Sequence, residues 1–147
     1  MASRRRAREY ALQSLFHADL GRIPARDALN ALWAGMLDDS DESLGGRAPD
    51  SEEIEFATRL AEGVEAERDD LDRRIEAAST NWRIVRMAVV DRNLLRLGAY
   101  ELLYCSDIPA NVTINEAVEL AKRFGAKDSK GFVNGILDRI ARDSGRL

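Results

Sequence analysis

The stretch TINEAVELAKRFGAKDSKGFVNGILDRI, residues 113–140, has the pattern of two helices joined by a short polar elbow. Apolar residues recur at i, i+3, i+4 and i+7 in its first half, and the same kind of spacing returns in its second half. The residues expected to face inward are Ala117, Leu120, Ala121 and Phe124, followed by Val133, Ile136, Leu137 and Ile140. The stretch therefore predicts a helical hairpin.

Polar and flexible residues predict where these two helices begin and end. Thr113 and Glu116 have the spacing of a capping box, in which each side chain accepts a hydrogen bond from a backbone N–H at the helix start. Gly125 stands where a helix commonly ends in a left-handed residue. Asp128 or Ser129 is expected to cap the second helix, because short polar side chains favour that position.

The rest of the chain has the same helical periodicity and no alternating strand pattern. Further helices are expected at about 3–20, 24–36, 50–64, around 71–75, and at 90–104. Asp50 with Glu53 is expected to open the third helix, and Asp91 to be the N-cap of the fifth. The sequence thus predicts an all-α fold of about seven helices, in a single domain covering residues 1–147.

Length and cysteine content limit the class of protein. A chain of 147 residues can bury an adequate core without disulfides. Its one cysteine, Cys105, lies in an apolar run, so we expect a buried, inert thiol and a reducing compartment. The apolar runs are too short for a signal sequence or a membrane span. These features predict a cytoplasmic protein.

The net charge of −4 conceals an uneven distribution of charge. Residues 37–72 contain 14 Asp and Glu against three Arg, a net of −11. The remaining residues contain 12 acids against 19 Lys and Arg, a net of +7. Because local charge decides where a polyanion binds, the two ends of the chain are candidates for contact with nucleic acid.

Four arginines, Arg4, Arg5, Arg6 and Arg8, precede the first apolar positions of the first helix. A step of about 100° per residue places Arg4 and Arg8 on one face. The four cations oppose the helix dipole, so this start is expected to fray in the free protein and to become ordered on a polyanion. A guanidinium can bond two phosphate oxygens at once. Phosphate binding is one interpretation, and a solvated basic tail is the other.

A second group of cations surrounds the elbow. It consists of Lys122, Arg123, Lys127 and Lys130. Phe16 on the first helix and Phe132 after the elbow are each able to stack on a base, the alternative for both being core packing. Aromatic residues among cations are typical of sites for single-stranded RNA, where stacking contributes about 1–3 kcal/mol per base.

Three stretches closely resemble the NusB family of bacterial transcription antitermination factors. They are SRRRAREYALQSLF (3–16), VVDRNLLRLGAYELLYCSDIPANVTINEA (89–117) and INEAVELAKRFGAKDSKGFVNGILD (114–138). Together they cover roughly half of the chain, whereas residues 21–83 contain no stretch of this kind. The resemblance implies two three-helix bundles packed crosswise.

The resemblance also implies a function. NusB-like proteins bind a short single-stranded boxA RNA together with NusE, a small-subunit ribosomal protein, and join the antitermination complex on RNA polymerase, notably on rRNA operons. The residues expected to bind RNA are Arg4, Arg5, Arg6, Arg8, Phe16, Lys127, Asp128, Ser129, Lys130 and Phe132. Those expected to contact NusE are Asp91, Tyr100 and Glu101. Some members form homodimers, and no exposed apolar stripe decides this here.

Two RNA-site residues need separate comment. Phe16 stands where the family often has Tyr, so stacking is retained and a hydroxyl hydrogen bond is lost. Asp128 places a carboxylate on the expected RNA surface, where we interpret it mainly as a helix cap. Replacing it with Asn should keep a cap and remove like-charge repulsion, and so tighten RNA binding.

The sequence contains no pattern typical of an enzyme. His17 is the single histidine, no glycine-rich phosphate loop or nucleophile elbow is present, and the acidic residues 38–42 lack the spacing of a calcium loop. We therefore expect no catalysis, metal or cofactor. Two alternatives to an antitermination factor stay open. One is the RNA-binding domain of an rRNA cytosine methyltransferase, and the other is a helical scaffold that binds only protein.

Overall fold

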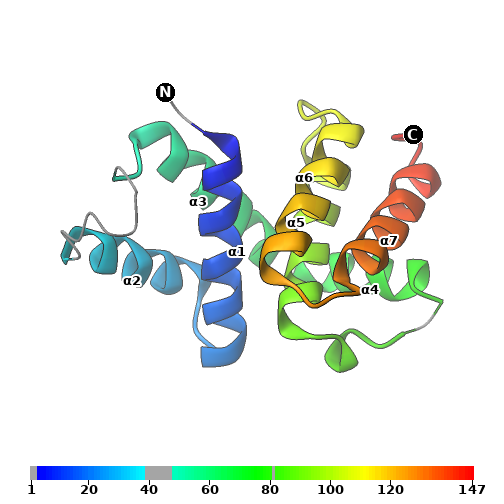
Figure 1. Cartoon of the computed structure of the whole chain (residues 1–147), viewed down its shortest axis with the longest axis horizontal. Coiled ribbons are helices and arrows are strands. Elements are labelled where there is room, and N and C mark those ends of the chain that lie inside the picture. Colours follow the sequence, from blue (N-terminus) through cyan, green and yellow to red (C-terminus); the bar gives the residue numbers. More distant parts are fainter. Residues whose placement is uncertain (1–2, 39–47, 81) are drawn as a thin grey trace. The chain divides into compact units, whose positions relative to one another are not determined.

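The computed structural model describes residues 3–38, 48–80 and 82–147. Within these ranges it contains seven α-helices, one 3-10 turn and no strand (Figure 1). The elements are α1 (Arg4–Gly21), α2 (Ala25–Asp38), α3 (Ser51–Ala66), α4 (Arg68–Ala78), η2 (Ile84–Arg86), α5 (Val89–Tyr104), α6 (Ala110–Phe124) and α7 (Ser129–Asp143). The all-α prediction is confirmed. Most of the acidic loop expected at 38–42 lies outside the described residues.

The chain forms two compact units, Met1–Glu62 and Gly63–Leu147. The first contains α1, α2 and most of α3, and the second contains α4 to α7. That residues 1–147 act as a single domain stays a prediction. None of the described helices has the combined length and apolar character that crossing a bilayer requires.

In the first unit, α1 packs against α2. Ser3 caps α1, since its Oγ accepts a hydrogen bond from the Arg6 N–H at 3.2 Å. The Tyr10 ring of α1 meets the Trp33 ring of α2 edge-on, with the ring centres 5.4 Å apart. Because each ring buries a large apolar area, this contact anchors the two helices to each other.

The start of α3 confirms the role expected for Asp50 and Glu53. The Glu53 N–H donates to Asp50 Oδ1 at 2.8 Å, and the Asp50 N–H donates to Glu53 Oε1 at 3.1 Å. This reciprocal pair is a capping box, which pairs two backbone N–H groups that the helix itself leaves without acceptors.

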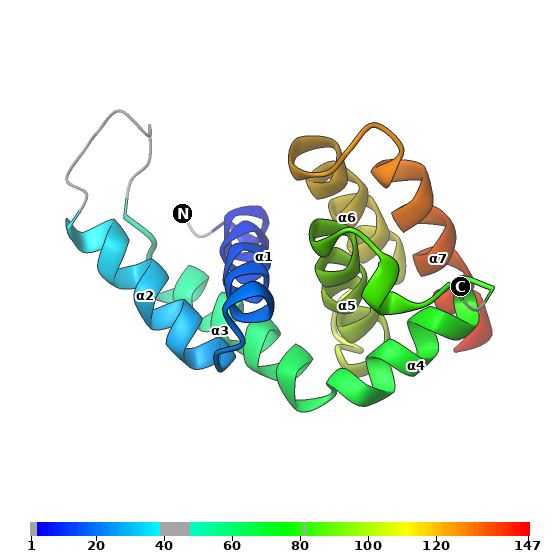
Figure 2. The ribbon, with the colours of Figure 1, turned by 90° about the horizontal axis from the view of Figure 1, so that it is seen from below.

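In the second unit, α5, α6 and α7 pack against one another, and α4 packs against α5 and α7 (Figure 2). The inward residues predicted for the hairpin are buried, except Phe124, which is half-buried. A Cβ built on Gly98 of α5 would lie 2.6 Å from Leu137 Cδ1 of α7. The missing side chain at Gly98 therefore lets α5 and α7 approach closely. Cys105 is buried as a free thiol, as expected.

The capping box predicted at Thr113 and Glu116 is wrong. Helix α6 begins at Ala110, and Pro109 is its N-cap with φ −60° and ψ 140°. The ring of proline fixes φ near this value, so the helix can begin directly after it. Thr113 therefore lies inside α6, where its buried Oγ1 donates to Glu101 Oε1 of α5 at 2.9 Å.

The N-cap predicted at Asp91 is also wrong. Ala88, with ψ 142°, precedes the first helical residue, and α5 begins at Val89. Asp91 thus lies in the first turn of the helix. Its carboxylate still faces the positive end of the helix dipole, so an acid there favours the helix start without capping it.

Candidate nucleic-acid interface

The four arginines at the start of α1 have different surroundings. The guanidiniums of Arg4 and Arg8 lie over the Phe56 ring of α3, at 4.4 and 5.5 Å from its centre, so these two residues share a face as expected. Arg4 and Arg5 are exposed, whereas Arg8 is only 3% exposed. Cation–π contact with Phe56 helps to accommodate the charged Arg8 side chain there. Arg4 and Arg5 are therefore the arginines best placed to contact a ligand.

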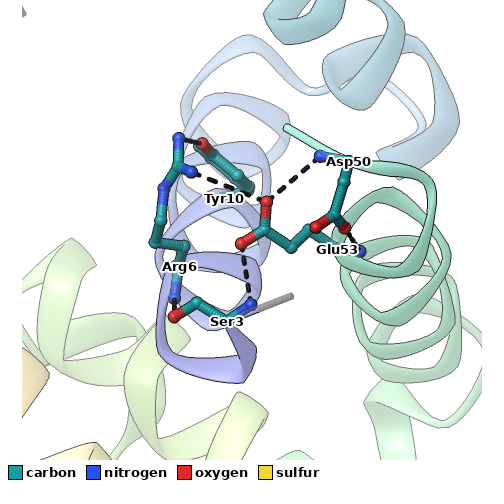
Figure 3. A network of polar contacts seen from close by, with 5 residues as sticks. All are labelled: Ser3, Arg6, Tyr10, Asp50 and Glu53. Carbon is teal, nitrogen blue, oxygen red and sulfur yellow. Dashed lines mark hydrogen bonds and ion pairs between the residues drawn. The ribbon is translucent and has the colours of Figure 1, made fainter. Parts of the chain in front are cut away.

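A buried carboxylate joins the start of α1 to the start of α3. Glu53 is 1% exposed, and its Oε2 accepts a hydrogen bond from the Ser3 N–H at 2.9 Å (Figure 3). Its Oε1 accepts from the Asp50 N–H and lies 3.6 Å from Arg6 Nη1. Arg6 Nη2 in turn donates to the Tyr10 hydroxyl. The Arg6 guanidinium is therefore engaged in contacts with Glu53 and Tyr10 of the first unit.

This carboxylate changes what is expected of the helix start. Its negative charge lies beside the positive end of α1, where it offsets the unfavourable arginines. The first turn is also capped by Ser3 and tied to α3 by Glu53. These contacts do not favour fraying of this turn, and its fraying in the free protein stays a prediction. Burial raises the pKa of the neighbouring Tyr10, and the Arg6 guanidinium opposes that rise.

Phe16 lies on an exposed face of α1, with 36% of its surface accessible. It follows Arg5 by eleven residues, which places the two about 20° apart around the helix and about 16 Å apart along it. Both residues are exposed. A cation and an aromatic ring thus share one side of α1, an arrangement that suits a nucleic-acid strand lying along the helix.

A hollow lies between the first turns of α1 and α3 in the same unit. Its lining consists of Ser3, Arg4, Ala7, Glu52, Glu53, Glu55, Phe56 and Arg59. Three carboxylates face two guanidiniums in this lining, so its charge does not favour phosphate. The hollow therefore adds nothing to the candidate nucleic-acid interface.

The elbow between α6 and α7 is held by Ser129. This residue is buried, and its Oγ accepts a hydrogen bond from the Ala126 N–H at 2.8 Å. Gly125 is extended, with φ −94° and ψ −176°, so the left-handed conformation predicted for it is wrong. A Cβ on Gly125 would lie 2.6 Å from Ser129 Oγ. The glycine thus serves the close packing of Ser129.

Asp128 is the N-cap of α7 by position, as one of the two predictions had it, but its side chain makes no capping hydrogen bond. Lys127, Asp128 and Lys130 are exposed. None of the three takes part in an ion pair among the described residues. The elbow thus presents two lysines and one carboxylate to solvent.

The other two cations of this group already have partners in α6. Lys122 Nζ lies 3.1 Å from a carboxylate oxygen of Glu119, and the Arg123 guanidinium lies 5.0 Å from the centre of the Phe124 ring. The Lys122 and Arg123 side chains are exposed, so these contacts are weak. Lys127 and Lys130 are the better placed cations of the elbow.

Phe132 is half-buried in the first turns of α7. Its ring meets the Trp82 ring with centres 6.3 Å apart and planes at 68°. Trp82 itself is 56% exposed. Trp82 is not among the residues that the sequence motifs single out, although its place between two helical segments and beside Arg83 is a usable signal.

The residues expected to contact a protein partner have unlike surroundings. Asp91 is half-buried, and its Oδ1 is buried with no hydrogen-bond partner among the described residues. Glu101 is buried and accepts the Thr113 hydrogen bond, so its side chain is used between α5 and α6. Its contact with a partner stays a prediction that this burial does not favour.

Tyr100 belongs to an aromatic pair on the same helix. Its ring stacks on that of Tyr104, with centres 5.5 Å apart and planes at 20°. The Tyr104 hydroxyl donates to Asp70 Oδ2 of α4 at 2.6 Å. This hydrogen bond raises the pKa of Tyr104 to about 12, and it lowers the pKa of Asp70. The pair gives α5 an aromatic edge, since Tyr104 is exposed.

The expected RNA-binding residues are divided between the two units. Those of α1 belong to the first unit, and those of the elbow and α7 belong to the second. Each unit combines exposed cations with an aromatic ring that is exposed or half-buried. Arg6, Arg8 and Ser129 are largely used in internal contacts.

A sequence model of the NusB family matches residues 5–142. The chain belongs to the NusB family. The match also covers residues 21–83, where inspection of the sequence finds no family motif. The transcription antitermination protein NusB of Geotalea daltonii is 50% identical over 143 residues, which cover 96% of this chain and 95% of that protein.

Solved structures of NusB-family proteins have the same fold. NusB of T. maritima has a TM-score of 0.82 at 39% identity, covering 97% of this chain and 94% of that one. A chain in the structure of the antitermination factors NusB and NusE with double-stranded RNA has a TM-score of 0.79 at 24% identity. It covers 95% of this chain and 96% of that one. The NusB-like fold expected from the sequence is thereby confirmed.

Proposed function

We propose that this chain is a transcription antitermination factor that binds single-stranded boxA RNA together with NusE, and so promotes processive transcription, notably of rRNA operons. Membership of the NusB family supports the proposal, because a relative that is half identical over nearly the whole chain is named a transcription antitermination protein. Such a factor works in the cytoplasm and makes or breaks no bond. Its contribution is binding energy.

The observation that carries RNA binding is the pairing of exposed cations with an aromatic ring in each unit. In the first unit, Arg5 and Phe16 share one side of α1, with Arg4 also exposed. Guanidiniums bind phosphate oxygens, and the Phe16 ring offers a stacking surface to a base. We assign Arg6 and Arg8 a positioning role, since both contact aromatic rings inside this unit.

In the second unit, Lys127 and Lys130 supply positive charge and Phe132 supplies the ring. Ser129 positions the elbow through its bond to the Ala126 N–H. Asp128 lies between the two lysines and weakens the local attraction for phosphate. This division of roles predicts which substitutions change RNA affinity directly.

Contact with NusE is supported most directly by Asp91. Its buried Oδ1 has no hydrogen-bond partner among the described residues, and an unpaired buried acceptor is costly. A cation or N–H group of a bound protein would satisfy it. A ribosomal protein is basic, so a carboxylate also aids its approach. Tyr100 and Tyr104 add aromatic surface of the kind enriched at interfaces.

Fluorescence anisotropy tests this proposal, using a boxA-like RNA oligomer and a shuffled one, with and without NusE, over a series of salt concentrations. We expect preference for the boxA-like oligomer and tighter binding with NusE. With four to six phosphate contacts, the slope of log affinity against log salt should be roughly −3 to −4. Equal, weak binding of both oligomers without an effect of NusE would leave a nonspecific basic tail on a helical scaffold.

A pair of charge-matched variants locates the phosphate contacts. Replacing both Arg4 and Arg5 with Gln should reduce the magnitude of the salt slope by about 1.4, because each lost contact with single-stranded RNA lowers it by about 0.7. Replacing Arg139 and Arg142 with Gln removes the same charge from the last turns of α7, where each guanidinium already has a carboxylate within 4 Å. This control should leave the slope nearly unchanged. Equal effects of the two pairs would show that only net charge matters.

The methyltransferase-domain alternative is less well supported. The relative from Geotalea daltonii is covered over 95% of its own length by this chain, and it is named as an antitermination protein. The protein-only scaffold needs no contact with RNA, so it predicts that the Arg4 and Arg5 variant leaves antitermination intact. A transcription assay that measures readthrough of a terminator, with boxA in the transcript, distinguishes that alternative from the proposal.

A further inference from the structure

The segment between α4 and α5 exposes a cluster of apolar and basic side chains. Ile84 and Met87 are buried and anchor the segment in the second unit. Trp82 and Val85, by contrast, are 56% and 68% exposed. Large apolar side chains in such a position commonly mark a binding surface.

The position of Trp82 is defined by its neighbours. The backbone N–H of Trp82 donates to the Ser79 carbonyl oxygen at 3.4 Å, and the Ser79 hydroxyl donates to the Trp82 carbonyl oxygen at 3.1 Å. Its ring meets the Phe132 ring edge-on. Phe132 is the elbow residue that the proposed function already assigns to base stacking. Trp82 therefore extends that aromatic surface from α7 to the neighbouring segment.

The charge around this aromatic pair favours a polyanion. Arg83 and Arg86 flank Val85 and are exposed, and Lys127 and Lys130 lie in the elbow and first turn from which Phe132 also projects. None of these four cations takes part in an ion pair among the described residues. Asp128 is the single carboxylate within 82–86 and 127–132. Such a surface repels a basic protein and attracts phosphates.

We propose that Trp82 is a further base-stacking residue of the RNA-binding surface, and that Arg83 and Arg86 bind phosphates beside it. The ligand is single-stranded RNA, so the inference rests on the proposed function and enlarges its site. Stacking on an exposed indole needs no particular base, whereas the phosphate contacts fix where the strand runs. The segment 82–86 would thus lengthen the RNA that the elbow can hold.

Tryptophan fluorescence tests this directly, because the chain has only two tryptophans. In a Trp33→Phe variant, all tryptophan emission comes from Trp82 with its surroundings unchanged. A base stacked on the indole quenches that emission. We expect saturable quenching by the boxA-like oligomer at the same RNA concentrations at which anisotropy reports binding.

Affinity measurements give a second test. Trp82→Ala should weaken binding by about 5- to 150-fold, the range for losing one stacked base, while Trp82→Phe keeps most of the affinity. Val85→Ser is the matched control, because it removes exposed apolar surface without an aromatic ring, and it should change affinity less than about twofold. Arg83→Gln with Arg86→Gln should reduce the salt slope by about 1.4.

The outcomes separate this inference from the proposed function. If the oligomer binds with boxA preference but leaves Trp82 emission unchanged, the inference is overturned and the proposed function stands. Quenching by NusE alone, with none by RNA, would overturn it in favour of a protein contact. If the wild-type protein shows no boxA preference, the proposed function fails and the inference fails with it.

Discussion

The Glu53 carboxylate gives the sharpest prediction about stability. Replacing Glu53 with Ala leaves the N–H groups of Ser3 and Asp50 without this acceptor, and it removes the carboxylate that lies 3.6 Å from Arg6 Nη1. It therefore loosens the starts of α1 and α3 at once, since the Ser3–Glu53 hydrogen bond joins residues fifty positions apart in the sequence. The effect should fall on the unit that contains the arginine cluster.

The size of the effect follows from these contacts. A hydrogen bond to a charged group contributes about 1.5–3 kcal/mol, and we take the lower limit because water can reach both half-buried N–H groups. Two such bonds amount to about 3 kcal/mol. The ion pair at 3.6 Å adds up to about 1 kcal/mol, since Arg6 is partly exposed. We therefore expect Glu53→Ala to lower the free energy of unfolding by about 3–4 kcal/mol.

Urea unfolding of the first unit measures this change. In a Trp82→Phe background the remaining tryptophan, Trp33, contacts Tyr10 and reports on that unit. Glu53→Gln keeps one acceptor of the capping box and should cost about 1–2 kcal/mol. Glu52→Ala, in the same helical turn but exposed, is the control and should change stability by about 0.5 kcal/mol or less. A loss below about 1 kcal/mol for Glu53→Ala would refute the argument that this carboxylate joins the two helices.

Three further predictions concern the second unit. The pKa of Tyr104 is raised to about 12 and that of Asp70 is lowered. Their hydrogen bond therefore stabilises the fold fully between the ordinary pKa of a carboxyl group and about pH 10, and this stabilisation is lost as the pH rises through 12. In Asp70→Asn the Tyr104 pKa should fall back toward 10, which phenolate absorbance measures. Gly125→Ala should cost about 1–3 kcal/mol in urea unfolding, because its Cβ overlaps Ser129, and a neutral result would contradict the close packing described. Asp128→Asn should cost about 1 kcal/mol or less, since no cap bond is lost and only the charge at the helix start is removed. It should tighten binding of the boxA-like RNA in anisotropy, and weaker or equal affinity would count against a repulsive role.

Sequence patterns are enough to propose the residues of the candidate site, but they do not give the surroundings of each side chain. The spacing of Arg4 and Arg8 correctly predicted a shared face. It could not show that Phe56 covers that face, because Phe56 belongs to another helix. Likewise the sequence offers Ser129 as a cap of α7 or an RNA contact, and it could not show that Ser129 Oγ holds the elbow by accepting from the Ala126 N–H.

A capping pattern predicts the start of a helix correctly only where no other residue nearby starts the helix first. Asp50 and Glu53 cap α3 as their spacing predicted. Thr113 also had the spacing of a cap, but Pro109 starts α6 earlier and leaves the threonine to bond Glu101 of α5. A capping pattern is therefore overridden when a proline upstream already satisfies the requirements of a helix start.

Local patterns in the sequence are enough to predict the helical class, the number of helices and most of their inward faces. These are properties of neighbouring residues, since a helix repeats every 3.6 residues wherever its apolar spacing allows. Three features come instead from contacts between distant segments: Arg8 is buried, Glu53 accepts a hydrogen bond from Ser3, and Trp82 lies exposed beside Phe132. Each of these features depends on which distant segments pack together. The free energy of that packing is spread over many contacts, which a local sequence pattern does not contain.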